Sequence, residues 1–114
     1  MPRLDGIDVS HWNAIQDFAA VRNSCQGSYF AMKCTEGVNF VDPEYSHYSA
    51  GAEGQNFKYI LDYHWLDSKT NAQEQANFFL SKCSHDHGAM LDAEEDGITA
   101  QQVMVWCDAV EQVL

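Results

Sequence analysis

Short apolar runs alternate with amphipathic stretches along the chain, and this alternation is the feature that most constrains its fold. The short runs are typical of strands, and the stretches between them carry apolar residues at helical spacing. The order strand then helix repeats four times, which favours a parallel sheet with right-handed crossovers. The sequence therefore predicts an α/β fold in one domain over residues 1–114, with no linker and no separate second domain.

The expected strands share an apolar run that ends in polar or aromatic residues. They cover residues 6–10, 29–34, 58–65 and 89–94. The expected helices share a capping residue at the start. The candidate caps are Asn13 with Gln16, Asp42 before Pro43, Thr70 with Gln73, and Thr99 with Gln102.

The chain is strongly acidic, with 17 Asp and Glu against 6 Lys and Arg and a formal charge of -11. Phosphate binding requires a basic face, so this charge argues against nucleic acid and against an anionic membrane surface as partners. No apolar stretch approaches the roughly 18 residues of a membrane span. Residues 1–5 also lack the apolar region of a secretory signal. We therefore expect no nucleic-acid partner, no membrane insertion and no signal peptide in this chain.

The cysteines at positions 25, 34, 83 and 107 show no C-x-x-C pair, and their spacing is unlike that of a zinc site. Cys34, Cys83 and Cys107 lie in apolar patterns, where a buried free thiol is the commoner state. The sequence thus favours free thiols over disulfides. It gives no spacing of metal ligands, and we expect neither a metal nor a cofactor.

Functional groups in parallel α/β folds collect at the carboxyl ends of the strands. Met90, Asp92 and Glu94 are spaced two apart, so on a strand they would project from one face. Repulsion and desolvation raise the pKa of one of two neighbouring carboxylates on a buried strand. A protonated carboxyl beside an ionised one suits glycoside hydrolysis. The alternative is a strand that ends at Leu91 and a solvated acidic loop, and the D-x-E pattern alone favours that alternative.

Two charged residues at other strand ends have two interpretations each. Asp8 would face inward by alternation with Gly6 and Ser10, or it would cap or turn the chain before the first helix. Lys33 would neutralise the carboxylates and bind substrate hydroxyls, or it would only extend from the strand end into solvent.

Aromatic residues and histidines also gather at the strand ends. Tyr63, Trp12 and Trp65 would form a platform on which sugars stack, or they would be core and rim aromatics. His11 and His64 are favoured as hydrogen-bonded structural residues over metal ligands. Each of these signals is weak when it is taken alone.

Taken together, the motifs at the strand ends match a known family. They are G-I-D-V-S-H-W-N (6–13), K-C-T-E-G (33–37), F-V-D-P-E-Y (40–45), Y-H-W (63–65) and M-L-D-A-E (90–94). This series strongly resembles glycoside hydrolase family 25, the Chalaropsis-type lysozymes found in phage endolysins and bacterial autolysins. The match runs from Gly6 to about Val110, and its first and last motifs are the most specific.

The resemblance implies a TIM-like barrel of the (β/α)5(β)3 kind, of which this chain would form the first four β-α units, a half barrel. It implies a muramidase that cleaves the β-1,4 bond between N-acetylmuramic acid and N-acetylglucosamine in peptidoglycan. Such a protein would be phage-encoded or made in a host cytoplasm, and would act at the bacterial cell wall. Glu94 matches the general acid, Asp92 its partner, and Asp8 a third active-site carboxylate. The residues expected to bind the saccharide are Lys33, Glu36, Tyr63, Trp65 and Trp12.

The family has a further half-barrel for which this sequence shows no counterpart. An open sheet of four strands would expose an edge and an apolar interior, which invites pairing with another chain. Three explanations stay open: a fragment, a truncated product completed by a second chain, and a closed isologous homodimer. Two functions without catalysis also stay open: a module that binds glycan or a protein partner, and an assembly component.

Overall fold

The computed structural model of the chain describes residues 6–24 and 27–114. Its parallel strands are β1 (Gly6–Val9), β2 (Tyr29–Glu36), β4 (Tyr59–Trp65) and β5 (Gly88–Asp92), in that order across the sheet. The two-residue strand β3 (Phe40–Val41) pairs antiparallel with the end of β2. The expected α/β fold with a parallel sheet is confirmed, whereas β3 was not expected from the sequence.

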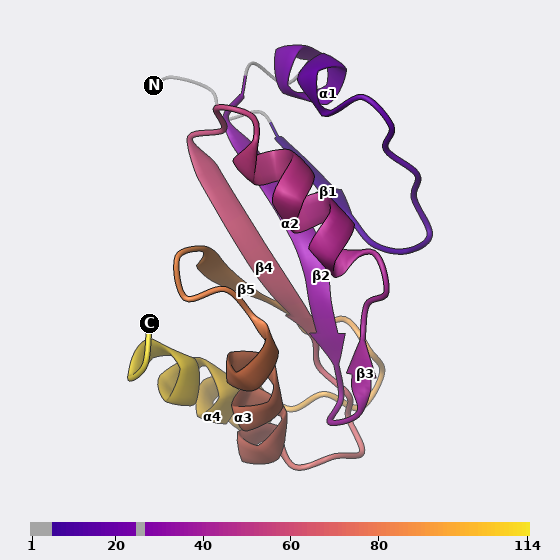
Figure 1. Ribbon diagram of the computed structural model, residues 1–114. Helices are drawn as coiled ribbons and strands as arrows, with labels where there is room; N and C mark the ends of the chain where they lie inside the picture. Colours follow the sequence, from indigo (N-terminus) through magenta and orange to yellow (C-terminus); the bar gives the residue numbers. More distant parts are fainter. Residues whose placement is uncertain (1–5, 25–26) are drawn as a thin grey trace.

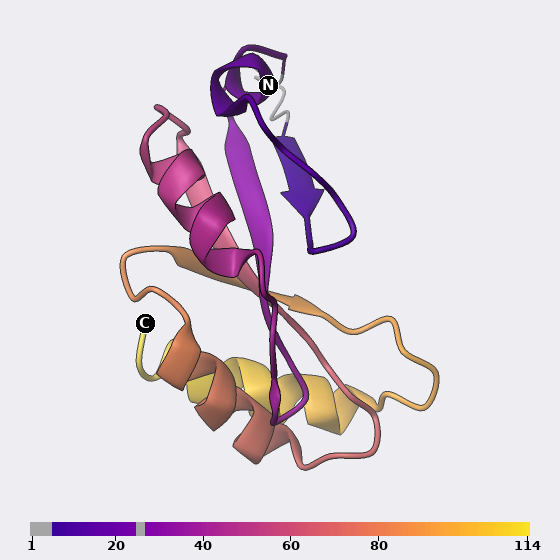
Figure 2. The ribbon, with the colours of Figure 1, turned by 45° about the vertical axis from the view of Figure 1, so that its right-hand side comes forward.

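The helices in the described part of the chain are α1 (Phe18–Ser24), α2 (Tyr45–Glu53), α3 (Ala72–Lys82) and α4 (Ala100–Glu111). They pack against one face of the sheet in two apolar clusters. Near α1 and α2, Phe30 of β2 meets Tyr48 of α2. Near α3 and α4, Cys34 of β2 meets Phe79 and Trp106. Figures 1 and 2 show α2 beside one end of the sheet and the α3–α4 pair beside the other.

The opposite face of the same strands, called here the open face, carries the side chains that alternate with the core. Asp8 lies between Ile7 and Val9, which pack into the first cluster. Tyr63 and Met90 are paired neighbours on β4 and β5, and both line a cavity with Asp8. Since strand side chains alternate faces, one face supplies the core and the other is left for a functional site.

A β-bulge in β2 changes this alternation at the end of the strand. The register with β4 shifts between Lys33 and Thr35. Cys34 packs into the helix-side cluster, and Thr35 Oγ1 also bonds there, 2.7 Å from Nδ1 of buried His64. The extra residue returns Glu36 to the open face, where its Oε1 lies 2.5 Å from Lys33 Nζ. A regular strand would place residues 33 and 36 on opposite faces.

The first helix begins later than the sequence suggests, and the expected cap at Asn13 is wrong. Asn13 Oδ1 instead accepts a hydrogen bond from the backbone N–H of Ser10, 2.9 Å away, and closes a turn. Asp17 Oδ1 accepts from the N–H of Ala20, 3.0 Å away, at the actual start of α1. A side chain of this type can bond to neighbouring backbone in a turn as readily as at a helix start.

The other caps give a mixed outcome. Asn71, not Thr70, caps α3 by accepting from the N–H of Glu74 at 3.0 Å. Helix α2 starts at Tyr45, two residues after Pro43. The capping box of Thr99 with Gln102 is confirmed at the start of α4.

The thiols of Cys34, Cys83 and Cys107 are free, as the sequence favours, and Cys25 lies outside the described residues. Within the described residues, none of the helices has the length and apolar character needed to cross a membrane.

Candidate active site

The carboxyl ends of β1, β4 and β5 meet around a hollow of about 460 Å³ on the open face, called here the carboxylate cavity. It is lined by Asp8, Tyr63 and the segment from Met90 to Glu94. The structure therefore brings the three carboxylates singled out in the sequence, Asp8, Asp92 and Glu94, to one place. They come from β1, from the last residue of β5 and from the loop that follows it.

The end of β5 decides how Asp92 and Glu94 are presented. The strand ends at Asp92, so the expectation of a strand through residue 94 is wrong by two residues. The Asp92 carbonyl accepts a hydrogen bond from the N–H of Leu66, 2.9 Å away, which fixes this end against the segment after β4. Asp92 is half-buried and Glu94 is exposed. Glu94 therefore reaches the cavity from a loop rather than from the strand face.

The raised pKa expected within this pair falls on Asp92. Burial raises the pKa of the Asp92 carboxyl, and the charge of Glu94 and a hydrogen bond with its side chain raise it further. The charge of Lys33 acts in the opposite direction but is a smaller influence. Two carboxyl groups coupled in this way hold a proton between them more readily than isolated ones.

Tyr63 supplies a hydrogen-bond donor at the base of the carboxylate cavity. It is 9% exposed. Burial, followed by the charges of Asp8 and Asp92, raises the pKa of Tyr63 to about 12. The phenol therefore stays protonated at neutral pH and can donate to an oxygen placed beside the carboxylates.

A second hollow of about 510 Å³, called here the aromatic cavity, shares Tyr63 with the first. Its lining brings together every residue that the sequence suggests for saccharide binding. It consists of His11, Trp12, Lys33, Glu36, Phe40, Tyr63, Trp65 and Glu95. Of these, His11, Phe40 and Glu95 were not among the residues expected to bind the saccharide.

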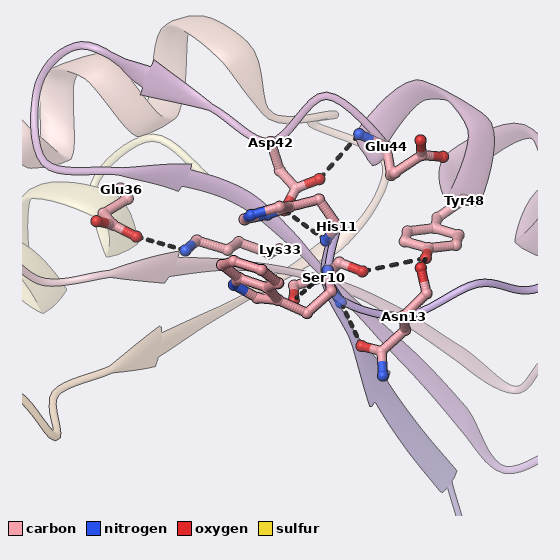
Figure 3. Close-up of polar contacts among 9 residues, drawn as sticks. Ser10, His11, Asn13, Lys33, Glu36, Asp42, Glu44 and Tyr48 are labelled. Carbon is pink, nitrogen blue, oxygen red and sulfur yellow. Dashed lines mark hydrogen bonds and ion pairs between the residues drawn. The ribbon is translucent and has the colours of Figure 1, made fainter.

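Lys33 is the buried cation of the aromatic cavity. It is 6% exposed, and its Nζ lies 5.3 Å from the ring centroid of Phe40 and 5.6 Å from that of Trp65. Its charge is balanced by Glu36, as Figure 3 shows. Trp12, by contrast, is 84% exposed, so a large aromatic face is open to solvent beside this ion pair. An exposed aromatic ring beside polar groups suits the apolar face of a sugar.

Both histidines noted in the sequence are hydrogen-bonded. His64 bonds to Thr35 Oγ1 and to Gln75 Oε1 at 3.0 Å, and burial lowers its pKa to about 4, which keeps it neutral. His11 bonds to Asp42, a buried carboxylate that the sequence indicated as a helix cap. Among the residues that the structure describes, no group of three or more His, Cys, Asp or Glu side chains could hold a metal ion.

Solved structures of known proteins resemble this one. A family 25 glycosyl hydrolase from Bacillus anthracis superposes with a TM-score of 0.82 at 18% identity, over 96% of this chain and 56% of that one. A lysozyme from Streptomyces coelicolor gives 0.74 at 22% identity, over 96% and 56%. The CTP1L endolysin gives 0.77 at 26% identity, over 94% and 41%. The chain thus spans about half the length of these proteins.

Sequence comparison gives the family. None of the curated protein sequences matches the chain. The family described as glycosyl hydrolases family 25 matches residues 7–114, which is nearly the whole sequence and covers the strand-end motifs from Ile7 onward. The chain belongs to glycosyl hydrolase family 25.

Proposed function

We propose that this protein is a muramidase that hydrolyses the β-1,4 bond between N-acetylmuramic acid and N-acetylglucosamine in peptidoglycan. The observation that carries the proposal is the carboxylate cavity, where Asp8, Asp92 and Glu94 line one hollow in a family 25 chain. Cleavage of a glycosidic bond requires a proton donor for the leaving oxygen and a second group that supports positive charge at the sugar.

Glu94 is the proposed general acid, because it is the exposed member of the pair and can reach a bound saccharide. Asp92 is half-buried, and its pKa is raised by burial and by Glu94, which favours a proton held between the two carboxyl groups. Once Glu94 has given its proton to the leaving oxygen, Asp92 is placed to orient the substrate's acetamido group or to support the developing cation. Asp8 and the protonated Tyr63 complete the polar lining.

The aromatic cavity is the proposed binding cleft for the sugars next to the cleaved bond. The two hollows share Tyr63 in their linings, so a saccharide strand bound across Tyr63 would contact both. Trp12 and Trp65 offer faces on which sugar rings stack, and Lys33 and Glu36 offer a donor and acceptors for sugar hydroxyls.

The test compares purified Glu94→Gln with the parent by the release of reducing ends from peptidoglycan. Loss of a general acid lowers a rate by roughly 10²-fold or more, so activity is expected to fall by at least about 100-fold with an unchanged melting temperature. Glu111→Gln, at the end of α4, is the matched control and is expected to keep the parental rate. A Glu94→Gln protein that hydrolyses walls as fast as its parent contradicts the assignment.

We further propose that a second copy of the chain pairs with the edges of the open sheet and completes the barrel as a homodimer. Strands β1 and β5 each have one sheet neighbour among the described residues, and Tyr59 of β4 is 47% exposed. Light scattering on size-separated protein, with an activity assay on each peak, is expected to find activity in a dimer. An active monomer contradicts this arrangement.

A saccharide-binding module without catalysis is the second candidate, supported by the exposed ring of Trp12 beside Lys33 and Glu36. It predicts saccharide binding that survives Glu94→Gln while no reducing ends appear from the parent protein. The same assays therefore separate the two functions.

A further inference from the structure

Asp42 is a buried carboxylate whose acceptors are all directed at neighbouring N–H groups. Its side chain is fully buried, and its Oδ1 accepts from the N–H of Glu44 at 2.8 Å. Its Oδ2 accepts from the backbone N–H of His11 at 2.9 Å and lies 2.9 Å from His11 Nδ1. Figure 3 shows these contacts between the segment before α2 and the segment after β1. One carboxylate thus fixes both the backbone and the ring of His11.

The contact with Asp42 determines which nitrogen of His11 carries the hydrogen. A carboxylate oxygen only accepts, so Nδ1 must donate, and a neutral imidazole then has its lone pair on Nε2. Among residues 6–24 and 27–114, no hydrogen bond reaches His11 Nε2. The ring is 25% exposed and lines the aromatic cavity with Lys33 and Glu36.

Aromatic contacts hold the same ring in place. The His11 ring centroid lies 4.6 Å from that of Trp12 and 5.6 Å from that of Phe40. The imidazole is therefore fixed at one edge by Asp42 and on its sides by two rings that line the aromatic cavity. A side chain locked in this way loses little rotamer freedom when a ligand binds.

We propose that Asp42 is a positioning residue that holds His11 in the Nδ1–H tautomer, so that Nε2 accepts a hydrogen bond from a saccharide hydroxyl in the aromatic cavity. The proposal rests on the proposed function, because it takes the aromatic cavity as the sugar-binding cleft. It adds a specificity determinant to that cleft: the other polar side chains of the lining include a cation and carboxylates, whereas His11 in the Nδ1–H tautomer supplies an acceptor with a fixed direction.

Two variants separate this role from a purely structural one. His11→Phe keeps a ring against Trp12 and Phe40 but removes both nitrogens. Asp42→Asn keeps one acceptor for the N–H of Glu44 but loses the acceptor for the backbone N–H of His11. Its amide N–H is then directed at Nδ1, which favours the Nε2–H tautomer. His85→Phe is the matched control, because His85 is an exposed histidine between α3 and β5 that lies outside the aromatic cavity.

The experiment has two readouts on the whole chain. Long-range ¹⁵N–¹H spectra at pH 8, with His11 identified by its absence in His11→Phe, report the tautomer without any ligand. Calorimetry with the tetrasaccharide of N-acetylglucosamine reports binding. We expect the Nδ1–H form in the parent, and binding about three- to tenfold weaker in His11→Phe and in Asp42→Asn, the effect of one hydrogen bond. The double variant is expected to bind no more weakly than His11→Phe.

Each contrary result overturns a defined claim. A hydrogen on Nε2 in the parent, or His11→Phe binding as tightly as His85→Phe, overturns the role of His11 while the proposed function stands. If the fold-losses of saccharide affinity from the two single variants multiply in the double variant, Asp42 does not act through His11. A parent protein that binds no tetrasaccharide overturns the proposal that the aromatic cavity is the sugar-binding cleft, and with it the proposed roles of His11 and Asp42. If Asp42→Asn does not fold, the parental tautomer and the His11→Phe affinity still decide.

Discussion

His87 Nδ1 lies 2.8 Å from Asp62 Oδ1, and both side chains are buried, at 4% and 1% exposed. Asp62 also accepts from the Tyr45 hydroxyl at 2.6 Å and from the N–H of Ser84 at 2.9 Å. The second ring nitrogen of His87 lies 2.8 Å from Glu53 Oε1, at the end of α2. Because a carboxylate oxygen lies beside each ring nitrogen, the doubly protonated imidazolium can donate two hydrogen bonds. These bonds connect α2 and the start of β5 to β4.

This arrangement predicts stability that falls as the pH rises. The hydrogen bond with Asp62 raises the pKa of His87, and Glu53 adds to the shift. A histidine whose pKa is higher in the folded state contributes its full stabilisation of the fold when the pH is below its ordinary pKa near 6.5. It loses that contribution as the pH rises through its folded pKa. His87→Asn is expected to cost about 2 kcal/mol at pH 6 and clearly less at pH 9.

Denaturant unfolding at both pH values measures this difference. The control is His85→Asn, which changes an exposed histidine two residues away. A parent and a His87→Asn variant whose stabilities change in parallel between pH 6 and pH 9 would show that the His87 proton is not linked to folding.

Asp92→Asn is expected to stabilise the fold at neutral pH. Burial and Glu94 raise the pKa of Asp92, so the folded state favours the protonated carboxyl and its ionisation at pH 7 opposes folding. The gain in melting temperature is expected to be present at pH 7 and to vanish at about pH 3, below the ordinary aspartate pKa near 3.9, where the carboxyl of the parent is protonated in both states. Asp108→Asn, on the exposed side of α4, serves as the control and should show no such pH-dependent gain.

Gly51→Ala is expected to destabilise the protein although Gly51 lies inside α2. Alanine in a helix interior normally gains roughly 1 kcal/mol over glycine. Here an added Cβ would lie 2.3 Å from the ring of Phe18, which packs into the first apolar cluster. Overpacking typically costs 1–3 kcal/mol, so we expect a net loss of about 1 kcal/mol. Gly54→Ala, where the nearest atoms lie 3.5 Å from the new Cβ, is the matched comparison in thermal melts.

The three thiols that the structure describes should react slowly in the native protein. Cys34 is fully buried, and burial raises its pKa; burial raises that of Cys83 to about 11. Only the thiolate reacts, so at pH 8 the thiol of Cys34 should be slowest with a disulfide reagent, and all three should react promptly in denaturant. A Cys25→Ser background isolates them. Rapid native modification of Cys34 would show that its cluster opens readily.

The sequence was sufficient to predict the strand order along the chain and the residues that gather at the strand ends. Asp8, Asp92 and Glu94 could be placed together because parallel strands bring their carboxyl ends to one edge. Their chemical roles remain proposals. The barrel itself also remains one, because the described strands form an open sheet path from β1 to β5.

What could not be predicted depends on contacts between distant segments. The bulge between Lys33 and Thr35 exists only in the pairing of β2 with β4, so residue alternation gives no sign of it. Asp42 looked like a helix cap, and its bond to His11 spans 31 residues. Asn13 had the right type for a cap, but its bond to Ser10 closes a turn three residues away. Local patterns assign element types better than they assign such long-range partners.

The β2 bulge means that the charge balance of the cleft is set by the pairing of two strands as well as by residue identities. If the same residues paired with β4 without the bulge, regular pleating would turn the Glu36 side chain away from Lys33 and toward the helices. A change of pairing that alters no catalytic group would thereby leave an unbalanced cation in the cleft and bury an acid in the core. In any set of related or designed sequences, the bulge between Lys33 and Thr35 should therefore tolerate change less well than the residue types around it do.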